Sequence, residues 1–281
     1  MTIKTVAFYG AGMLGSGFVK SLRRQGFEVH VWNRSFERAQ ALESVGAQAF
    51  RDAAEAARGA DLVQICVRDE AAVDAVLDAA LPGISAESPV VDHSTVNPAT
   101  VAPRAQRLVA GGHPFLHAPV FMGPPMAESA QGIMLAAGAQ TTFDALQEHL
   151  SKLCGKLKYF GERVDLAAIY KLLGNAMILA VVGGINDVLT IAQAQGLSRT
   201  QAYELFSFFS PEGQITGRGR KMAEGDYAPL WTLEMADKDA RLMQTVAGGT
   251  PLPVIDAVEA ALHAQMERNL GNRDLGAIAA R

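Results

Sequence analysis

The first half of the chain alternates short apolar runs, rich in β-branched residues, with amphipathic or alanine-rich stretches. Each run has the length of a strand, and each stretch between runs has the apolar spacing or the alanine content of a helix. This alternation predicts right-handed βαβ crossovers and a mainly parallel sheet. The predicted strands are residues 5–9, 28–32, 62–67, 89–92, 116–121, 133–137 and 156–160.

The pattern changes after Gly161. Residues 166–195 form a long, mostly apolar stretch of helical character, and three more helix-like segments follow. We therefore predict an α/β fold, with a Rossmann-type doubly wound sheet over residues 1–162. An all-α C-terminal domain over residues 163–281 follows, beginning with a long interdomain helix. Open α/β sheets bind ligands at the carboxyl ends of their strands, so we expect the site in a cleft between the two domains.

Several features of the helical half lead to further expectations. The most apolar stretch, residues 176–185, is shorter than the roughly 20 residues that span a bilayer, so it predicts a buried helix. Glycines weaken helices, so the pair at 183–184 predicts close helix packing and the pair at 248–249 predicts a loop. The aromatic residues of 206–209 indicate buried packing, in a core or an interface.

Composition and charge narrow the classes of function. The 281 residues are 49% hydrophobic and 19% charged, which is typical of a soluble globular protein. With 25 basic and 29 acidic residues the net charge is −4, so neither nucleic acid nor a membrane is an expected partner. Cys66 and Cys154 lie far apart, outside any Cys/His cluster, so we predict no metal site and no disulfide framework. A reducing cytoplasm fits best, since the first residues lack the order of a signal peptide.

A GxGxxG motif, GAGMLG at 10–15, lies directly between the first predicted strand and a helical pattern at 16–25. In this position the first glycine permits the tight turn, the second lets the backbone approach a pyrophosphate, and the third lets the helix sit against the strand. The helix N-terminus then faces the phosphates. We predict that the dinucleotide is bound by Gly10, Gly12, Met13, Leu14 and Gly15.

The second predicted strand ends without the carboxylate that an NAD enzyme usually places against the ribose hydroxyls. Asn33, Arg34 and Ser35 stand there instead. An amide and a hydroxyl can hydrogen-bond the ribose, and a guanidinium offers a planar fork to a 2′-phosphate. The sequence therefore predicts NADP(H) as the cofactor, with NAD(H) less favoured.

Six motifs follow one another in the chain: GAGMLGSGFVKSL at 10–22, WNRSFERAQAL at 32–42, DHSTVNPAT at 92–100, HAPVFMG at 117–123, YKLLGN at 170–175 and ADKDARL at 236–242. In sequence and order they resemble the β-hydroxyacid dehydrogenase family, which includes 3-hydroxyisobutyrate dehydrogenases, tartronate semialdehyde reductases and glyoxylate/succinic semialdehyde reductases. The resemblance extends over essentially the whole chain. It implies hydride transfer between a nicotinamide cofactor and a hydroxy acid, its oxo partner or a semialdehyde, in a homodimer or homotetramer formed partly by the helical domain.

By the same resemblance, Lys171 corresponds to the catalytic lysine and Asn175 to an asparagine that holds substrate. The spacing of these two residues agrees, because residues four apart on a helix share one face. An ammonium stabilises the negative charge that hydride transfer builds on a carbonyl oxygen, and it supplies the proton. In the oxidative direction the lysine must be neutral, which burial in an apolar cleft favours.

The resemblance also implies four further residues at the cofactor. Cys66 and Val67 correspond to the segment that lines it, Thr95 to a contact near the nicotinamide, and Lys238 to a lysine of the second domain that closes over it.

The predicted substrate pocket departs from the family pattern. It comprises Ser94, Phe121, Met122 and Gly123, and the family usually has Ser-Gly-Gly at the last three positions. Two bulky apolar side chains fill space and remove a hydroxyl donor, so we expect a substrate that is less polar than glyoxylate or 3-hydroxyisobutyrate, or anchored differently. His117 stands where the family has Asp, and we interpret it as structural.

Two alternatives stay open. One is a reductase of imines or bulkier ketones; imine-reducing relatives generally lack the lysine found at Lys171. The other is a non-catalytic NADP(H)-binding module, which has no chemical reason to keep that lysine.

Overall fold

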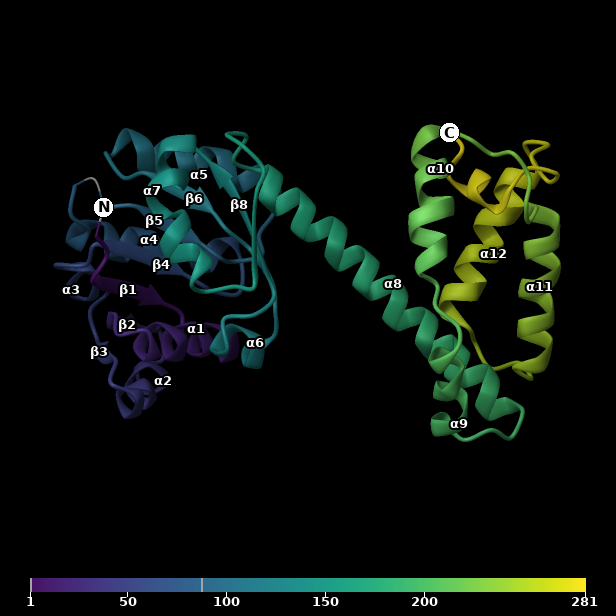
Figure 1. Ribbon diagram of the computed structural model, residues 1–281, viewed down its shortest axis with the longest axis horizontal. Helices are drawn as coiled ribbons and strands as arrows, with labels where there is room; N and C mark the ends of the chain where they lie inside the picture. Colours follow the sequence, from purple (N-terminus) through teal and green to yellow (C-terminus); the bar gives the residue numbers. More distant parts are fainter. Residues whose placement is uncertain (1, 87) are drawn as a thin grey trace. The chain divides into compact units, whose positions relative to one another are not determined.

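The computed structural model describes residues 2–86 and 88–281 (Figure 1). Its contacts divide the chain into two compact units, Met1–Asn175 and Ala176–Arg281. The division falls inside helix α8 (Leu166–Ala194), later than the boundary predicted from the sequence.

The first turn of α8 explains the later boundary. Ala167 and Ala168 are buried, the first beside Leu135 and Ala137 and the second in a core of the first unit. The beginning of α8 therefore belongs to the first unit by packing.

The first unit contains the predicted doubly wound sheet, which comprises nine strands among the residues described. Six parallel strands lie in the order β3-β2-β1-β4-β5-β6, the order of a dinucleotide-binding Rossmann fold. They are β1 (Thr5–Tyr9), β2 (Glu28–Trp32), β3 (Gln48–Phe50), β4 (Leu62–Ile65), β5 (Val90–Asp92) and β6 (Phe115–His117). β8 (Ile133–Gly138) pairs antiparallel with β6 and with β7 (Val120–Phe121), and parallel with β9 (Lys156–Tyr159).

The strands differ from the prediction at two places. The run predicted at 116–121 is divided between β6 and β7 around Pro119, which has no N–H to donate to a sheet and whose carbonyl oxygen accepts a hydrogen bond from Leu135 at 2.9 Å. The edge strand β3 was not predicted, because its three residues are too few to show an alternating pattern.

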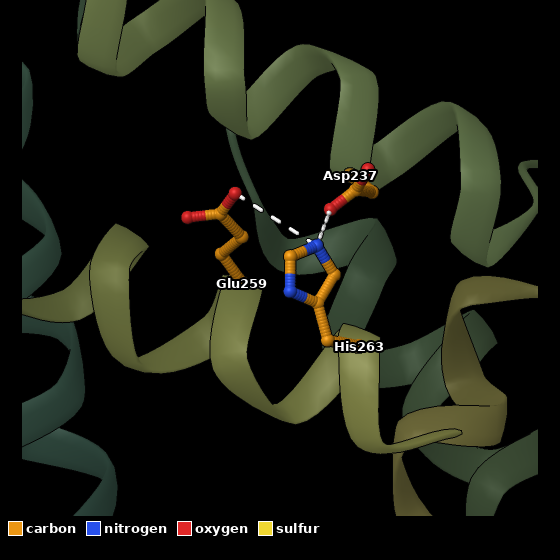
Figure 2. Close-up of side chains that lie close together, drawn as sticks. All are labelled: Asp237, Glu259 and His263. Carbon is orange, nitrogen blue, oxygen red and sulfur yellow. Dashed lines mark ion pairs between the residues drawn. The ribbon is translucent and has the colours of Figure 1, made fainter. Parts of the chain in front are cut away.

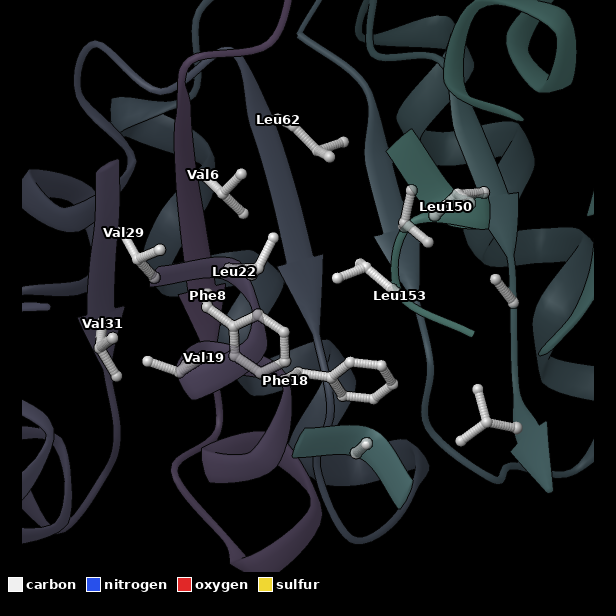
Figure 3. Close-up of a cluster of buried hydrophobic side chains, with 14 of the residues drawn as sticks. Val6, Phe8, Phe18, Val19, Leu22, Val29, Val31, Leu62, Leu150 and Leu153 are labelled. Atoms are coloured by element: carbon white, nitrogen blue, oxygen red, sulfur yellow. The ribbon is translucent and has the colours of Figure 1, made fainter. Parts of the chain in front are cut away.

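Helices cover both faces of this sheet. α1, α6 and α7 contribute to one apolar core, part of which is drawn in Figure 3, and α3, α4 and α5 contribute to the other. Phe8, Phe18 and Leu22 are fully buried in the first core, and burial of each such side chain stabilises the fold by roughly 1.5–3 kcal/mol. The helices of this unit are α1 (Met13–Arg24), α2 (Phe36–Gln40), α3 (Ala53–Ala57), α4 (Glu70–Ala80), α5 (Pro98–Ala110), α6 (Pro124–Glu128) and α7 (Gln140–Ser151).

The second unit is helical, as predicted, with one isolated β-bridge between Thr232 and Asp274 in its described residues. It contains the rest of α8, α9 (Arg199–Tyr203), a π-helical turn at Gln214–Arg218, α10 (Gly219–Glu224), α11 (Leu233–Val246), α12 (Pro253–Met266) and 3₁₀ turns at Glu204–Ser207 and Leu275–Ala279.

A buried carboxylate ties the end of the chain to this unit. Asp274 accepts hydrogen bonds from the Arg218 guanidinium at 2.9 Å and from the backbone N–H of Gly276 at 2.9 Å. It also accepts from the backbone N–H groups of Leu230 and Trp231. Burial alone raises the pKa of Asp274, but these donors outweigh burial and hold the pKa well below its usual range.

The glycine pairs behave as predicted. A Cβ on Gly183, inside α8, would lie 2.7 Å from a methyl of Val254, so the two elements pack closely there. Gly248 and Gly249 both have positive φ and form the turn after α11.

The single chain leaves residues 176–185 largely exposed, so the prediction of a buried helix is wrong for one chain alone; it also exposes Phe208 and Phe209, and burial of the aromatic residues of 206–209 in an interface stays a prediction. Leu179 is 73% exposed, Val182 60% and Phe208 80% in the single chain. The sequence gives the apolar character of a stretch but not whether one chain alone covers it. By length and composition α8 could cross a membrane, and only 17% of its most apolar 18 residues are buried.

Candidate active site

The turn between β1 and α1 brings backbone segments into very close contact. Gly10 has a φ of +107°, and a Cβ there would lie 2.1 Å from the carbonyl oxygen of Cys66. A Cβ on Gly15 would lie 1.9 Å from the carbonyl oxygen of Gly10. Both positions therefore require glycine. A Cβ on Gly12 would instead point into open space, where a bound group can approach the backbone.

The same turn presents the N-terminus of α1. The helix begins at Met13, and its N-cap residue, Gly12, offers no side chain to cap it. The first N–H groups of a helix have no partner within the helix, and together with the helix dipole they form an anion site. This arrangement fits the pyrophosphate of a dinucleotide.

A cleft of about 900 Å³ opens beside this turn. It contains all the predicted residues of the glycine motif and of the end of β2, together with Cys66, Val67 and Met122. It also contains Arg68 and Asp69 of the loop after β4 and the first turns of α4, which were not predicted although they follow the carboxyl end of a central strand. The lining residues are Gly10, Gly12, Met13, Leu14, Gly15, Trp32, Asn33, Arg34, Ser35, Arg38, Cys66, Val67, Arg68, Asp69, Ala71, Ala72, Ala75, Val76, Met122 and Pro124.

At the end of β2 the three predicted residues take different positions. Asn33 joins two loops, because its Oδ1 accepts from the N–H of Ala11 at 3.0 Å and its Nδ2 donates to the carbonyl oxygen of Ser35 at 2.9 Å. Arg34 and Arg38 are exposed at the cleft. Two guanidinium groups therefore face the solvent where a 2′-phosphate is expected.

One carboxylate also lines the cleft. Asp69 caps α4 by accepting from the N–H of Ala72 and pairs with Arg68 at 2.7 Å. The Ala72 N–H, then Arg68 and, more weakly, Arg34 hold the pKa of Asp69 below its usual range. Asp69 remains charged at neutral pH and is already engaged by the chain's own donors.

Beneath the cleft lies a buried polar layer. The hydroxyl of Ser94 accepts from the N–H of Val67 at 3.0 Å, and the N–H of Ser94 donates to Asp92 at 2.8 Å. Ser94 is only 1% exposed and lies behind the cofactor segment, and its part in the substrate pocket stays a prediction. Burial, reinforced by Asp92, raises the pKa of the Cys66 thiol to about 12, which leaves it uncharged at neutral pH.

His117 is structural in this arrangement. It is fully buried, and its Nε2 lies 3.0 Å from the carbonyl oxygen of Ser94. Burial lowers the pKa of His117, so the ring is neutral and donates to that carbonyl.

Lys171 lies on α8 against an aromatic ring. Its Nζ is 4.1 Å from the centre of the Phe121 ring, a cation–π distance. The same ring packs on Gly174, where a Cβ would lie 2.2 Å from a ring carbon. Phe121 therefore fits into a notch of α8 between Lys171 and Gly174. Burial lowers the pKa of Lys171.

The other predicted site residues lie on several elements of the two units. Asn175 is half-buried one helical turn after Lys171, and Thr95 is exposed after the carboxyl end of β5. Gly123 is half-buried just before α6. Lys238, on α11, is mostly exposed and pairs with Asp239 at 2.7 Å, and its role at the cofactor remains a prediction.

Comparison with known proteins agrees with the motifs. Residues 5–161, over half of the chain, match the family model of the NAD binding domain of 6-phosphogluconate dehydrogenase. The cytokine-like nuclear factor N-PAC of Xenopus tropicalis is 30% identical over 99% of this chain and 53% of its own length. The mitochondrial 3-hydroxyisobutyrate dehydrogenase of Drosophila melanogaster is 24% identical over 98% of this chain and 88% of its own length. The chain thus spans about half the length of the N-PAC proteins that it matches.

Solved structures confirm the fold. An imine reductase from Pseudomonas sp. has a TM-score of 0.90 at 22% identity, covering 100% of both chains. A reductive aminase from Aspergillus terreus, in complex with NADPH and ethyl-5-oxohexanoate, has a TM-score of 0.89 at 20% identity, covering 99% of this chain and 98% of that chain. The glycine turn, the six motifs and the match to the family model together show that the chain belongs to the β-hydroxyacid dehydrogenase family. The NAD-binding domain of this family is of the same type as that of 6-phosphogluconate dehydrogenase.

Proposed function

We propose that this chain is an NADP(H)-dependent oxidoreductase that interconverts a hydroxy acid and its oxo acid, or reduces a semialdehyde. The observation that carries this proposal is the half-buried Lys171, held over Phe121 at 4.1 Å. Met122, the next residue after Phe121, lines the cleft that fits the dinucleotide. Phe121 contacts Lys171 and Met122 lines the cleft, so these two adjacent residues of the first unit connect the lysine with the cleft.

In the reductive direction Lys171 donates its proton to the substrate oxygen as negative charge develops there. Asn175, one turn further on the same helix face, donates an amide hydrogen to that oxygen and holds it. In the oxidative direction the neutral amine of Lys171 accepts the proton, and the lowered pKa makes this form accessible. The nicotinamide, when bound, supplies the hydride chemistry.

Replacing Lys171 tests this mechanism directly. Lys171→Met keeps the length of the side chain but removes the proton and the charge, so kcat for reduction should fall by about 10²–10⁴-fold. NADPH affinity should change less than about twofold, because Lys171 does not line the cleft. Steady-state NADPH consumption and a fluorescence titration measure the two quantities.

The matched control is Lys158→Met, since Lys158 is an exposed lysine whose Nζ lies 5.9 Å from the ring of Phe160. It should leave kcat unchanged.

In the unmodified enzyme, reduction should slow as pH rises through the lowered pKa of Lys171, and oxidation should quicken over the same range. Full activity of Lys171→Met would remove the lysine from the mechanism.

The apolar pair Phe121 and Met122 supports a substrate that is less polar than glyoxylate. The unmodified enzyme should turn over longer apolar oxo acids faster than glyoxylate. Phe121→Ser restores a hydroxyl and vacates the notch beside Gly174, so it should shift the ratio of kcat/KM towards glyoxylate by roughly tenfold. A strong preference of the unmodified enzyme for glyoxylate would contradict this assignment.

The same apolar pair supports a second candidate, the reduction of imines or bulkier ketones, and the solved structures of similar fold include enzymes named for that chemistry. A panel that sets cyclic imines and ketones beside oxo acids separates the two. Under a third possibility, a non-catalytic NADP(H)-binding module, no compound in the panel is turned over.

The cofactor preference rests on Arg34 and Arg38 at the cleft. Arg34→Asp places a carboxylate against the 2′-phosphate, so NADPH affinity should fall by roughly 10–100-fold while NADH affinity changes much less. Arg51→Asp is the control: it alters net charge equally, but Arg51 stacks on Phe36 and does not line the cleft. Equal losses for both cofactors would exclude Arg34 from the phosphate site.

We further propose that a second copy of this chain covers the exposed apolar surface of α8. The exposed apolar residues of α8 include Leu173, Met177, Leu179 and Val182, which are 46–73% exposed and lie on more than one side of the helix, and exposed apolar surface of this kind marks interfaces. The unmodified chain should elute as a dimer or tetramer in light-scattering chromatography, and Leu179→Asp should shift it towards monomer. Leu230→Asp, at a leucine that is 79% exposed elsewhere, should not. A monomer, or a chain that binds detergent micelles and not a second copy of itself, would contradict this proposal.

A further inference from the structure

A cluster of potential metal ligands lies in the second unit between α11 and α12 (Figure 2). Asp237 comes from α11, whereas Glu259 and His263 come from one face of α12, four positions apart. His263 Nε2 lies 2.7 Å from Asp237 Oδ1 and 3.9 Å from Glu259 Oε1, and all three atoms lie within 4.8 Å of one another. Because these residues come from two helices, no short sequence motif contains all three.

The second oxygen of each carboxylate is already held. Arg241 Nη2 lies 2.8 Å from Asp237 Oδ2, and Gln244 Nε2 donates to Glu259 Oε2 at 2.6 Å. Asp237 Oδ1 and Glu259 Oε1 are directed at His263, and Arg241 Nε also lies 3.6 Å from Glu259 Oε1. Hydrogen-bonded outer partners of this kind orient the ligands of metal sites.

The chain's own groups do not satisfy the centre of the cluster. Asp237 is only 7% exposed, yet its Oδ1 has no hydrogen-bond donor within the described residues. His263 Nε2 lies between that oxygen and Arg241 Nη2, which is 3.1 Å away. Without a proton, Nε2 turns its lone pair towards the carboxylate; with a proton, it forms an ion pair with Asp237 Oδ1 beside the positively charged guanidinium. A divalent cation bound between the three ligand atoms would take the place of that proton.

We propose that Asp237, Glu259 and His263 bind a divalent transition-metal ion of the zinc class. One imidazole nitrogen and two carboxylate oxygens suit zinc, whereas calcium and magnesium favour oxygen ligands alone. Tetrahedral zinc with bonds of about 2.0–2.2 Å sets its ligands about 3.4 Å apart, between the two separations from Nε2 seen here. The His263 side chain is 44% exposed, so an ion can reach the cluster from solvent and can keep a water molecule as a further ligand.

Such an ion would join α11 to α12 and stabilise the second unit. Binding of this ion requires neither the cofactor nor the substrate. Its test is therefore independent of the proposed oxidoreductase activity.

The test is a calorimetric titration of the whole chain, freed of metal with EDTA, with zinc chloride at pH 7. We expect one zinc per chain with micromolar or tighter affinity. His263→Gln, Glu259→Gln and Asp237→Asn should each weaken binding at least tenfold, and Gln244→Leu, which frees the outer oxygen of Glu259, should weaken it less. Glu267→Gln, an exposed carboxylate at the end of α12, should bind zinc like the unmodified chain.

A second readout covers variants that fold poorly. Zinc should raise the Tm of the unmodified chain and of Glu267→Gln by several degrees, but not that of His263→Gln, whose fold circular dichroism can verify. Absence of zinc binding in the micromolar range, or binding of unchanged strength in His263→Gln, would overturn the proposal.

Discussion

The cofactor cleft depends on one steric constraint, the contact of three backbone segments at the first turn of the chain. Gly10 lies against the carbonyl oxygen of Cys66, and Gly15 lies against the carbonyl oxygen of Gly10. These contacts set where α1 begins relative to the ends of β1 and β4, and hence where its free N–H groups point. A side chain at either glycine would separate the strands from the helix and deform the cleft that both of them line.

A second close fit connects the cleft to the proposed chemistry. Phe121 occupies the notch at Gly174 and lies beneath the ammonium of Lys171, while Met122 turns to the cleft. Phe121, which differs from the usual pattern of the family, is therefore the residue that contacts the proposed catalytic lysine. The ring stabilises the charged form of Lys171 by cation–π attraction, and burial favours the neutral form. The balance between these two effects determines how readily Lys171 releases or accepts a proton.

The sequence predicts local structure better than burial and long-range contact. The strands at 5–9 and 28–32 were predicted residue for residue, because the first is a fully buried run and the second alternates buried with more exposed positions. The glycine motif was placed correctly because its spacing reflects the steric contacts of one turn. Apolar pattern could not show that α8 is exposed in a single chain, nor that Ser94 lies behind the cleft. The cluster of Asp237, Glu259 and His263 was missed, because two successive helices supply it and no short sequence motif contains all three residues.

The central claim is that the cleft binds NADP(H) and that the lysine beside it completes a hydride transfer. The most direct measurement is a titration with NADPH and NADH, followed by absorbance at the nicotinamide band with oxo acids, aldehydes, ketones and imines. The account predicts tighter binding of NADPH than of NADH, and consumption of NADPH with an apolar oxo acid or aldehyde. Binding of NADPH without consumption by any compound of the panel would contradict it.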